Sequence, residues 1–370
     1  MTDFSSLMRY IQILVECESP SDDKAAVARS ADAVTSIGRS SLGMEPESIV
    51  IEGTTHVRWR FGVGPRRVLI LAHHDTVWPI GSLAENPFTF HDGVLRGPGV
   101  FDMKAGLALG IQALSELSEG ERDGITLLVT GDEEIGSPTS RALIEEEARG
   151  LDAALILEPS ADGGALKIAR KGASIYRIDI NGRAAHAGLD PESGINAGLE
   201  LAHQILAVAT LGDTNLGTTV TPTVAAAGST TNTVPAHASL MIDARAWSSA
   251  EQSRVDNAIR ELPTTVAGTG VTISGGINRP PMEESMTFGL FERTQGVASR
   301  LGLRRPSSAS VGGASDGNFT AGIGTPTLDG LGAVGGGAHA DSEHVQADQL
   351  LPSVALLRGL LEDLRSHRKS

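Results

Sequence analysis

The sequence predicts an α/β protein in which a main domain with a mostly parallel sheet is interrupted by a smaller ferredoxin-like domain. Two observations predict this fold: strand-like and helical runs alternate in the first half of the chain, and a β-α-β-β-α-β order follows them. The length agrees, because 370 residues exceed the size at which a single hydrophobic core usually stops growing. We therefore expect two domains, one inserted into the other.

In the first half, short apolar runs typical of buried strands alternate with segments of helical pattern. The predicted elements are the strands Val68–Ala72, Ile125–Thr130 and Ala153–Glu158 and the helices Ala105–Leu117 and Pro138–Glu147. Each strand runs into a polar cluster, HHD, GDEE or EPS. Because ligand sites of open α/β sheets collect at the carboxyl ends of strands, we expect the active site there.

The pattern changes after Lys171. The next elements form a β-α-β-β-α-β unit of about a hundred residues, the usual size of a small domain. They are Ala173–Asn181, Gly194–Ala207, Thr219–Ala226, Ala238–Ala244, Ser249–Glu261 and Val271–Gly275. Helices near Thr287–Leu301 and at Ala347–His367 then return the chain to the main domain. We therefore place the main, metal-binding domain at residues 1–170 and 286–370 and the inserted domain at residues 171–285.

The composition narrows the classes of partner. A formal net charge of −15 makes nucleic acid and anionic membranes poor partners, because their phosphates would be repelled over most of the surface. Cys17 is the only cysteine, so no disulfide within the chain is expected, and we interpret it as a small apolar residue of the first helix. The N-terminal stretch does not read as a signal peptide, and no run of 18 apolar residues occurs. The sequence thus predicts a cytoplasmic protein.

The first polar cluster is Ala72-His73-His74-Asp75, at the end of an apolar strand. His73 and Asp75 alternate onto the same side of an extended chain, so the Asp75 carboxylate can orient the His73 imidazole. Metal-bound histidines commonly give their second ring nitrogen to such a carboxylate. An HxD pattern alone is more often structural, and His74, which points the opposite way, is interpreted as structural.

Two further clusters supply acidic side chains. RGPGVFDMKAG delivers Asp102 at a predicted helix start. There Asp102 is either an N-cap or, because each carboxylate oxygen can serve one ion, a bridge between two cations. GDEEIGS places Glu133 and Glu134 in a tight turn after a strand. They form either a solvated acidic turn, or a metal ligand beside the general base that a metal-activated water needs.

Glu158 and His339 complete the set. The apolar strand before Glu158 would bury its carboxylate unless a cation paired with it. His339 follows three consecutive glycines in a tightly constrained loop, although a lone histidine is more often structural. Together the clusters offer two histidines and three carboxylates plus a spare glutamate, the nitrogen and oxygen donor set suited to zinc or a similar divalent ion.

The motifs HHDTV, RGPGVFDMKAG, GDEEIGS, LEPS, RAAHAG, TTNTVP, MIDAR and GGGAH, in this order, resemble those of the aminoacylase-like di-zinc metallopeptidases. The resemblance covers nearly the whole chain. It is closest to the glutamate carboxypeptidase branch, and looser to acetylornithine deacetylase, succinyl-diaminopimelate desuccinylase and carnosinase. One small departure is Ala72, where many relatives carry glycine, and we expect it to be harmless.

The resemblance implies two bound divalent metal ions, zinc first, with cobalt or manganese as alternatives. Asp102 would bridge both ions, and the Asp102–Met103 peptide bond would be cis. The other ligands that the resemblance implies are His73 and Glu158 on one ion, and Glu134 and His339 on the other. A member of this family would have a zinc-peptidase-like catalytic domain, with the inserted domain serving as a lid and dimerisation domain.

The resemblance also implies the catalytic roles. Glu133 would be the general base, and Asp75 would orient His73. In the inserted domain, His186 would donate a hydrogen bond to the oxyanion developing in the neighbouring subunit of a homodimer, and Asn232 would contact the substrate. Without the resemblance, these two would be a loop histidine and a turn asparagine.

Recognition of a substrate carboxylate is expected from two places. Arg245 ends the strand MIDAR and has the planar fork that grips a carboxylate, although an ion pair with Asp243 is an equal alternative. The loop Gly312–Gly317 resembles the carboxylate-binding loop of the family, and the sequence does not choose among its members.

The predicted activity is hydrolysis of the amide bond of an N-acyl amino acid or small peptide, releasing a C-terminal amino acid, with glutamate as one candidate. An N-acyl amino acid deacylase of the acetylornithine deacetylase type is an alternative within the class. A non-catalytic protein that binds amino-acid derivatives is an alternative outside it, but no expected catalytic residue is missing. A two-metal phosphoesterase is disfavoured, because the sequence shows no basic phosphate pocket.

Overall fold

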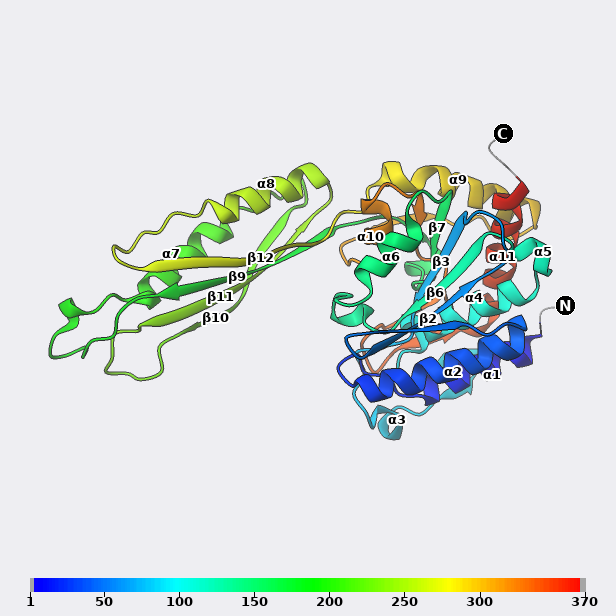
Figure 1. Ribbon diagram of the computed structural model, residues 1–370, viewed down its shortest axis with the longest axis horizontal. Coiled ribbons are helices and arrows are strands. Elements are labelled where there is room, and N and C mark those ends of the chain that lie inside the picture. Colours follow the sequence, from blue (N-terminus) through cyan, green and yellow to red (C-terminus); the bar gives the residue numbers. More distant parts are fainter. Residues whose placement is uncertain (1–2, 367–370) are drawn as a thin grey trace. The chain divides into compact units, whose positions relative to one another are not determined.

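The computed structural model describes residues 3–366. The chain divides into two compact units, each visible in Figure 1. The first unit contains the chain up to Ala169, the segment Glu284–Val311 and the chain from Ser315 onward; the second contains Arg170–Glu283 and Gly312–Ala314. His367, where the sequence predicts that the last helix ends, lies outside the described residues.

A six-stranded sheet forms the centre of the first unit (Figure 1). Its strand order is β1-β2-β6-β3-β7-β14. The pairs β6–β3, β3–β7 and β7–β14 are parallel, whereas β1–β2 and β2–β6 are antiparallel. The mostly parallel sheet that the sequence predicts is confirmed. The strands are β1 (Glu47–Ile51), β2 (Thr54–Arg60), β3 (Val68–His73), β6 (Ile125–Thr130), β7 (Ala153–Ile156) and β14 (Thr327–Leu328).

Helices cover both faces of this sheet, because alternate strand residues face opposite cores. In β3, Ile70 packs in the larger core with α1, α2, α4, α9 and α11, whereas Leu71 packs in a smaller core with α6 and α10. Nearly every residue of α4 is buried, since α1, α2 and α11 also pack against it. These helices are α1 (Phe4–Glu16), α2 (Lys24–Leu42), α4 (Ala105–Ser115), α6 (Arg141–Ala148), α9 (Glu284–Arg300), α10 (Gly317–Gly322) and α11 (Leu350–Ser366).

Short elements complete the first unit. Two small sheets have the orders β15-β16-β5-β4 and β13-β8. Their strands are β4 (Thr89–His91), β5 (Val94–Arg96), β8 (Leu166–Arg170), β13 (Ser308–Val311), β15 (Gly335–Gly336) and β16 (His344–Gln346). The single turns are α3 (Ser82–Glu85), α5 (Glu119–Arg122), η1 (Val100–Lys104), η2 (Glu133–Ile135), η3 (Asp162–Gly164) and η5 (Ala347–Gln349).

The second unit is an antiparallel four-stranded sheet with two long helices (Figure 1). The elements follow the chain order β9-α7-β10-β11-α8-β12, and the strand order in the sheet is β10-β11-β9-β12. Its own core contains Tyr176, Ile178, Leu240 and Ile242, from the two central strands. The elements are β9 (Gly172–Asn181), η4 (Pro191–Ser193), α7 (Ala197–Ala209), β10 (Thr219–Ala227), β11 (His237–Ala246), α8 (Ser249–Arg260) and β12 (Gly270–Arg279).

The observed elements differ from the expected ones mainly at their ends. The strand predicted at Ile125–Thr130 is reproduced residue for residue. One detail is wrong: Cys17 does not lie in the first helix, because α1 ends at Glu16 and the Cys17 N–H caps it by donating to the carbonyl of Ile13. Within residues 3–366, no helix has the length and apolar character needed to cross a bilayer.

Candidate metal centre

The carboxyl ends of three neighbouring strands carry the acidic and histidine clusters. His73 is the last residue of β3, Glu133 and Glu134 lie in the turn after β6, and Glu158 lies two residues beyond β7. Parallel strands end at the same edge of a sheet, so the β6–β3–β7 neighbourhood brings these side chains together. The site expected at this edge therefore has its side chains in place.

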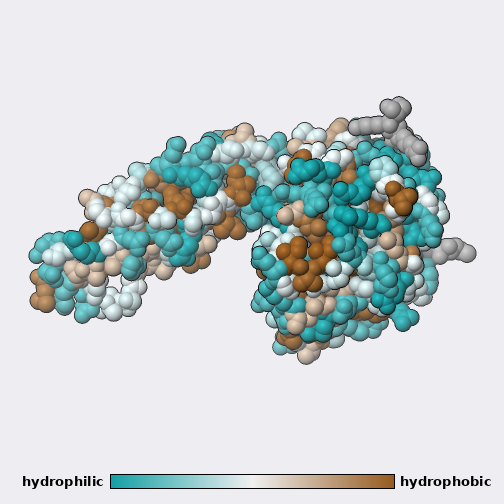
Figure 2. All heavy atoms as spheres, viewed as in Figure 1, coloured by the Kyte–Doolittle hydropathy of each residue, from teal (hydrophilic) through white to brown (hydrophobic). Residues whose placement is uncertain are grey.

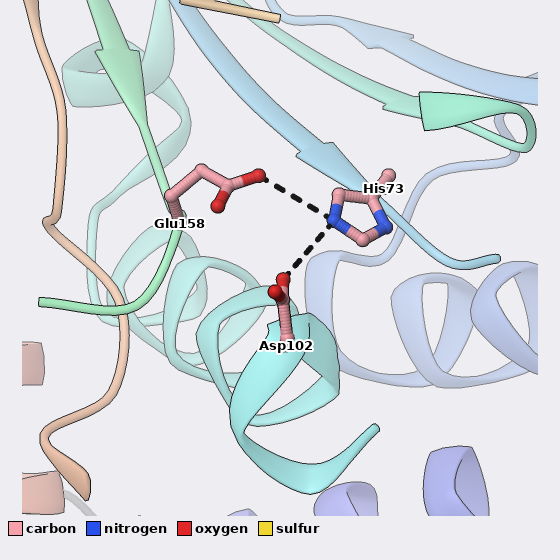
Figure 3. A group of neighbouring side chains, drawn as sticks. All are labelled: His73, Asp102 and Glu158. Atoms are coloured by element: carbon pink, nitrogen blue, oxygen red, sulfur yellow. Dashed lines mark ion pairs between the residues drawn. The ribbon is translucent and has the colours of Figure 1, made fainter. Parts of the chain in front are cut away.

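One group of candidate ligands contains His73, Asp102 and Glu158. Figure 3 shows the His73 ring nitrogen directed at both carboxylates. His73 Nε2 lies 3.5 Å from Asp102 Oδ1 and 3.4 Å from Glu158 Oε1. The His73 side chain is buried, and its Nε2 makes no hydrogen bond to any residue that the structure describes. A buried ring nitrogen that faces two acids is suited to a cation.

A second group contains Asp102, Glu134 and His339. His339 Nε2 lies 3.3 Å from Asp102 Oδ2 and 3.3 Å from Glu134 Oε2. Asp102 thus offers one oxygen to each group. Its backbone is not helical, α4 begins at Ala105, and no side chain caps that helix. The structure therefore excludes the N-cap interpretation of Asp102, and the Asp102–Met103 peptide bond is cis, as the family resemblance implies.

The donor atoms have a spacing that suits a divalent ion such as zinc. Two ligand atoms about 2 Å from a tetrahedral zinc ion are about 3.3 Å apart, and the four separations given above are 3.3–3.5 Å. In addition, Glu134 Oε1 is buried without a hydrogen-bond partner among residues 3–366. The nitrogen and oxygen donors also match the chemistry of zinc. The two groups therefore fit a pair of metal ions that share Asp102.

The electrostatics of the metal-free cluster agree with this fit. Burial would lower the pKa of His73, but Asp102, Asp75 and Glu158 outweigh it and raise that pKa well above its usual value. Asp102 and Glu134 raise the pKa of His339 to about 10. In both cases the carboxylates that face the histidine favour positive charge at its ring.

Asp75 has a wider structural role than the sequence indicates. His73 Nδ1 lies 3.0 Å from the Asp75 carbonyl oxygen and 3.5 Å from its carboxylate. The same carboxylate, fully buried, accepts the backbone N–H groups of Glu133 and Glu134 at 3.2 Å each and the Ser21 hydroxyl at 2.6 Å. One side chain therefore holds both His73 and the turn that carries the expected general base.

Several residues around the site were missed from the sequence. Ser21 donates to the Asp75 carboxylate, and Glu343 accepts the backbone N–H of Asp102. Lys104, fully buried, donates from Nζ to the Cys17 carbonyl at 2.9 Å. Burial lowers the pKa of Lys104 to about 8. The one available signal was sequence proximity, since Glu343 lies four residues after His339 and Lys104 two after Asp102. Their partners are distant in the chain and were not predictable.

In the second unit, the structure brings His186 and Asn232 together. The Ala187 N–H donates to the Asn232 carbonyl at 2.9 Å. His186 also forms an isolated antiparallel β-bridge with Thr233. His186 Nδ1 accepts the N–H groups of Gly188 and Leu189 at 3.1 Å each. The neutral imidazole of His186 therefore carries its proton on Nε2. The side chains of His186 and Asn232 are both exposed.

The expected carboxylate-binding residues have internal partners. Arg245 donates from Nε and Nη2 to Asp243 at 2.8–3.1 Å, so the ion pair anticipated as an alternative is present. In the loop Gly312–Gly317, Ser315 and Asp316 are buried. Ser315 Oγ donates to Asp329, and Asp316 accepts the hydroxyl of Thr130. Only the residues up to Ala314 remain accessible in that loop.

Comparison with known proteins identifies the family. Residues 69–363 match peptidase family M20/M25/M40. The chain belongs to this family. The predicted resemblance is thereby confirmed, and this M20 chain is a metal-dependent amide hydrolase, as its sequence predicts.

Individual relatives agree with this assignment. Carboxypeptidase G2 of Pseudomonas sp. (strain RS-16) is 29% identical to the M20 chain over 376 residues, covering 97% of the chain and 89% of the relative. Succinyl-diaminopimelate desuccinylase of Methylorubrum populi is 30% identical over 322 residues, covering 80% and 82%. An M20 family metallo-carboxypeptidase from Sulfolobus solfataricus has the same fold, with a TM-score of 0.77 at 17% identity, covering 98% of this chain and 99% of that one.

Proposed function

We propose that this M20 chain is a two-metal carboxypeptidase-type amidohydrolase that cleaves an N-acyl amino acid or small peptide next to a free carboxylate. The observation that carries the proposal is the Asp102 carboxylate, whose two oxygens face two separate groups of histidine and glutamate at 3.3–3.5 Å. The carboxypeptidase and the desuccinylase described above act on substrates of this class by their names, which supports the proposal.

The residues of the chain divide the chemistry among them. Two bound divalent ions would polarise the amide carbonyl and make a water acidic near neutral pH. Glu133 accepts the proton of that water on its carboxylate and later gives it to the departing amine. Asp75 supports this role, because it holds the Glu133 backbone N–H at 3.2 Å. Zinc suits the donors best, with cobalt or manganese as alternatives.

The second unit would supply the substrate contacts. His186 Nε2–H is free of the loop, because Nδ1 takes the two loop N–H groups, and it donates to the oxyanion as negative charge develops. Asn232, beside it, contacts the substrate. Arg245 has five N–H donors, of which one on Nε and one on Nη2 bind Asp243, so that donors remain for a substrate carboxylate.

The geometry of the second unit supports a site shared between two chains. His237 starts β11 next to the Asn232 loop, whereas Arg245 lies near its other end, paired with Ala173, where the chain enters the unit. Eight residues of strand span about 26 Å, which is too far for one small substrate to contact both ends. In a homodimer, one substrate would receive Arg245 from one chain and His186 with Asn232 from its partner.

An exposed apolar surface supports dimerisation through this unit. Leu199 and Leu206 of α7 are 57% and 69% exposed, and Val224 of the neighbouring edge strand β10 is 62% exposed. The visible face in Figure 2 has brown apolar residues among teal polar ones on this unit. A twofold axis would place the same apolar residues of two copies against each other.

The proposal also includes a cellular location and a second candidate activity. A cytoplasmic location rests on the single cysteine, Cys17, which allows no disulfide bond within the chain. An N-acyl amino acid deacylase would use the same residues, and the desuccinylase relative favours it as a second candidate. A panel of N-acyl amino acids and dipeptides, assayed on chelated protein refilled with each metal, separates the two.

Glu133→Gln tests the mechanism directly. The amide cannot accept the proton of the water, so turnover should fall at least 100-fold in kcat, while two metal ions per chain remain bound because Glu133 is not a ligand. Metal content by mass spectrometry and kcat on the best substrate give the result. Loss of metal from this variant, or a kcat near that of the parent, would contradict the general-base assignment.

A further inference from the structure

Glu343 is a buried carboxylate to which the mechanism above gives no role. Its side chain is 2% exposed and accepts four hydrogen bonds. Oε1 accepts the backbone N–H groups of Phe101 at 2.8 Å and Asp102 at 3.0 Å. Oε2 accepts the backbone N–H of Gly99 at 3.1 Å and the indole N–H of Trp78 at 2.7 Å.

These bonds join the loops of two candidate ligands. Glu343 closes the loop between β15 and β16, and His339 lies inside that loop. The loop turns back on itself through the Ala340 N–H to the Gly337 carbonyl at 3.0 Å and the Glu343 N–H to the Ala340 carbonyl at 2.8 Å. One carboxylate therefore ties the backbone of Asp102 to the segment that carries His339.

The two metal-ligand groups differ in how much they depend on this link. His73 belongs to the buried strand β3, which pairs with β6 and β7 on both sides. His339 instead has a half-exposed side chain and a left-handed backbone with φ +63°, in a loop outside the central sheet. Its loop is connected to the Asp102 loop by the bonds of Glu343 and, on the flanking strands, by the pairing of β16 with β5.

We infer that Glu343 is a positioning residue for the metal ion held by Asp102, Glu134 and His339, and that the ion held by Asp102, His73 and Glu158 depends on it less, through Asp102 alone. The inference rests on the proposed two-metal centre. Changing a residue that orients metal ligands typically weakens metal binding about 10- to 100-fold. We expect the full weakening for the ion of His339 and a smaller one for the other ion, because the two ions share Asp102, whereas the four hydrogen bonds of Glu343 reach neither His73 nor Glu158.

The experiment is a metal titration of chelated protein. Cobalt(II) is added to the parent and to Glu343→Gln, and the stoichiometry and each Kd are measured by calorimetry and visible absorption. The parent should bind two ions. Glu343→Gln, whose amide group cannot accept all four bonds, should bind the first ion with a Kd close to the parental one and the second about 10- to 100-fold more weakly.

Glu200 offers a matched control. It is also a fully buried glutamate that accepts backbone N–H groups, those of Thr265 and Val266 at 2.6–3.3 Å, but it lies in the second unit. Glu200→Gln should lose thermal stability as Glu343→Gln does, yet bind both ions with parental affinity. If Glu200→Gln weakens the second ion as much as Glu343→Gln does, or if Glu343→Gln weakens both ions equally or neither, the inference is overturned.

The remaining outcomes are also decisive. If the parent binds fewer than two ions, the proposed two-metal centre fails and the inference falls with it. If Glu343→Gln does not fold, Trp78→Phe removes one of the four donors while leaving the carboxylate in place. It should weaken the second ion more than the first, and parental binding of both ions would overturn the role of Glu343.

Discussion

Arg245→Ala tests the substrate class that we propose. The Arg245 side chain is 31% exposed, and its Nε and Nη2 groups each donate to the Asp243 carboxylate. A hydrogen bond between charged groups contributes about 1.5–3 kcal/mol, which corresponds to about 10- to 150-fold in kcat/KM. Because partial exposure allows solvent to screen the pair, we expect the lower end, about tenfold.

The assay compares an N-acyl amino acid with its α-methyl ester. Arg245→Ala should raise KM about tenfold for the acid, in line with the lost charge-assisted bond, and leave the ester nearly unchanged. Arg177 provides a matched control, since it makes the same two-residue ion pair with Asp179 on the neighbouring strand β9. Equal losses for acid and ester, or the same loss in Arg177→Ala, would refute the role of Arg245.

Three further predictions follow from the same contacts. Asp75→Asn should lower kcat/KM about 10- to 100-fold, because the amide cannot accept every bond that the carboxylate accepts; kinetics within threefold of the parent would contradict this. Chains carrying Glu133→Ala and His186→Ala, both inactive alone, should regain about a quarter of the active sites when refolded together as random dimers, and adding Leu206→Asp to both should abolish that recovery. Burial lowers the pKa of His74 to about 4. An unfolded histidine titrates near pH 6.5, so below that pH the unfolded chain binds a proton that the buried neutral His74 does not bind. The free energy of unfolding is therefore unaffected by His74 above pH 6.5 and decreases as the pH falls toward 4. At pH 5 the decrease in the free energy of unfolding is about 2 kcal/mol. Urea unfolding of His74→Gln should not show this decrease.

The sequence by itself determined the features that depend on neighbours in the chain. Apolar runs such as Ile125–Thr130 identify buried strands, because a strand inside a parallel sheet needs apolar side chains on both faces. The same runs locate the clusters that follow them, so His73, Glu133 and Glu158 were found from their place at strand ends. The order of these motifs was enough to predict the family.

The edge strands were not predictable in this way. β1 is only partly buried and pairs with β2 in a hairpin that joins the parallel strands at the antiparallel side of the sheet. The burial of its residues depends on which strand it pairs with and on which of its two edges is exposed to solvent. A local pattern contains neither piece of information, because strand order depends on the packing of the whole sheet.

Only the tertiary structure decided how the site is held. Whether Asp102 caps a helix or bridges two ligand groups depends on a backbone that leaves the helical conformation at that residue. The partners that fix the site are far away in sequence: Ser21 is 54 residues from Asp75, and Glu343 is 242 residues from Phe101. Such bonds form only after distant segments have packed, and a buried carboxylate accepts whichever N–H groups that packing brings to it. The sequence therefore shows which groups are available for the chemistry, and the packed chain decides which groups hold them in position.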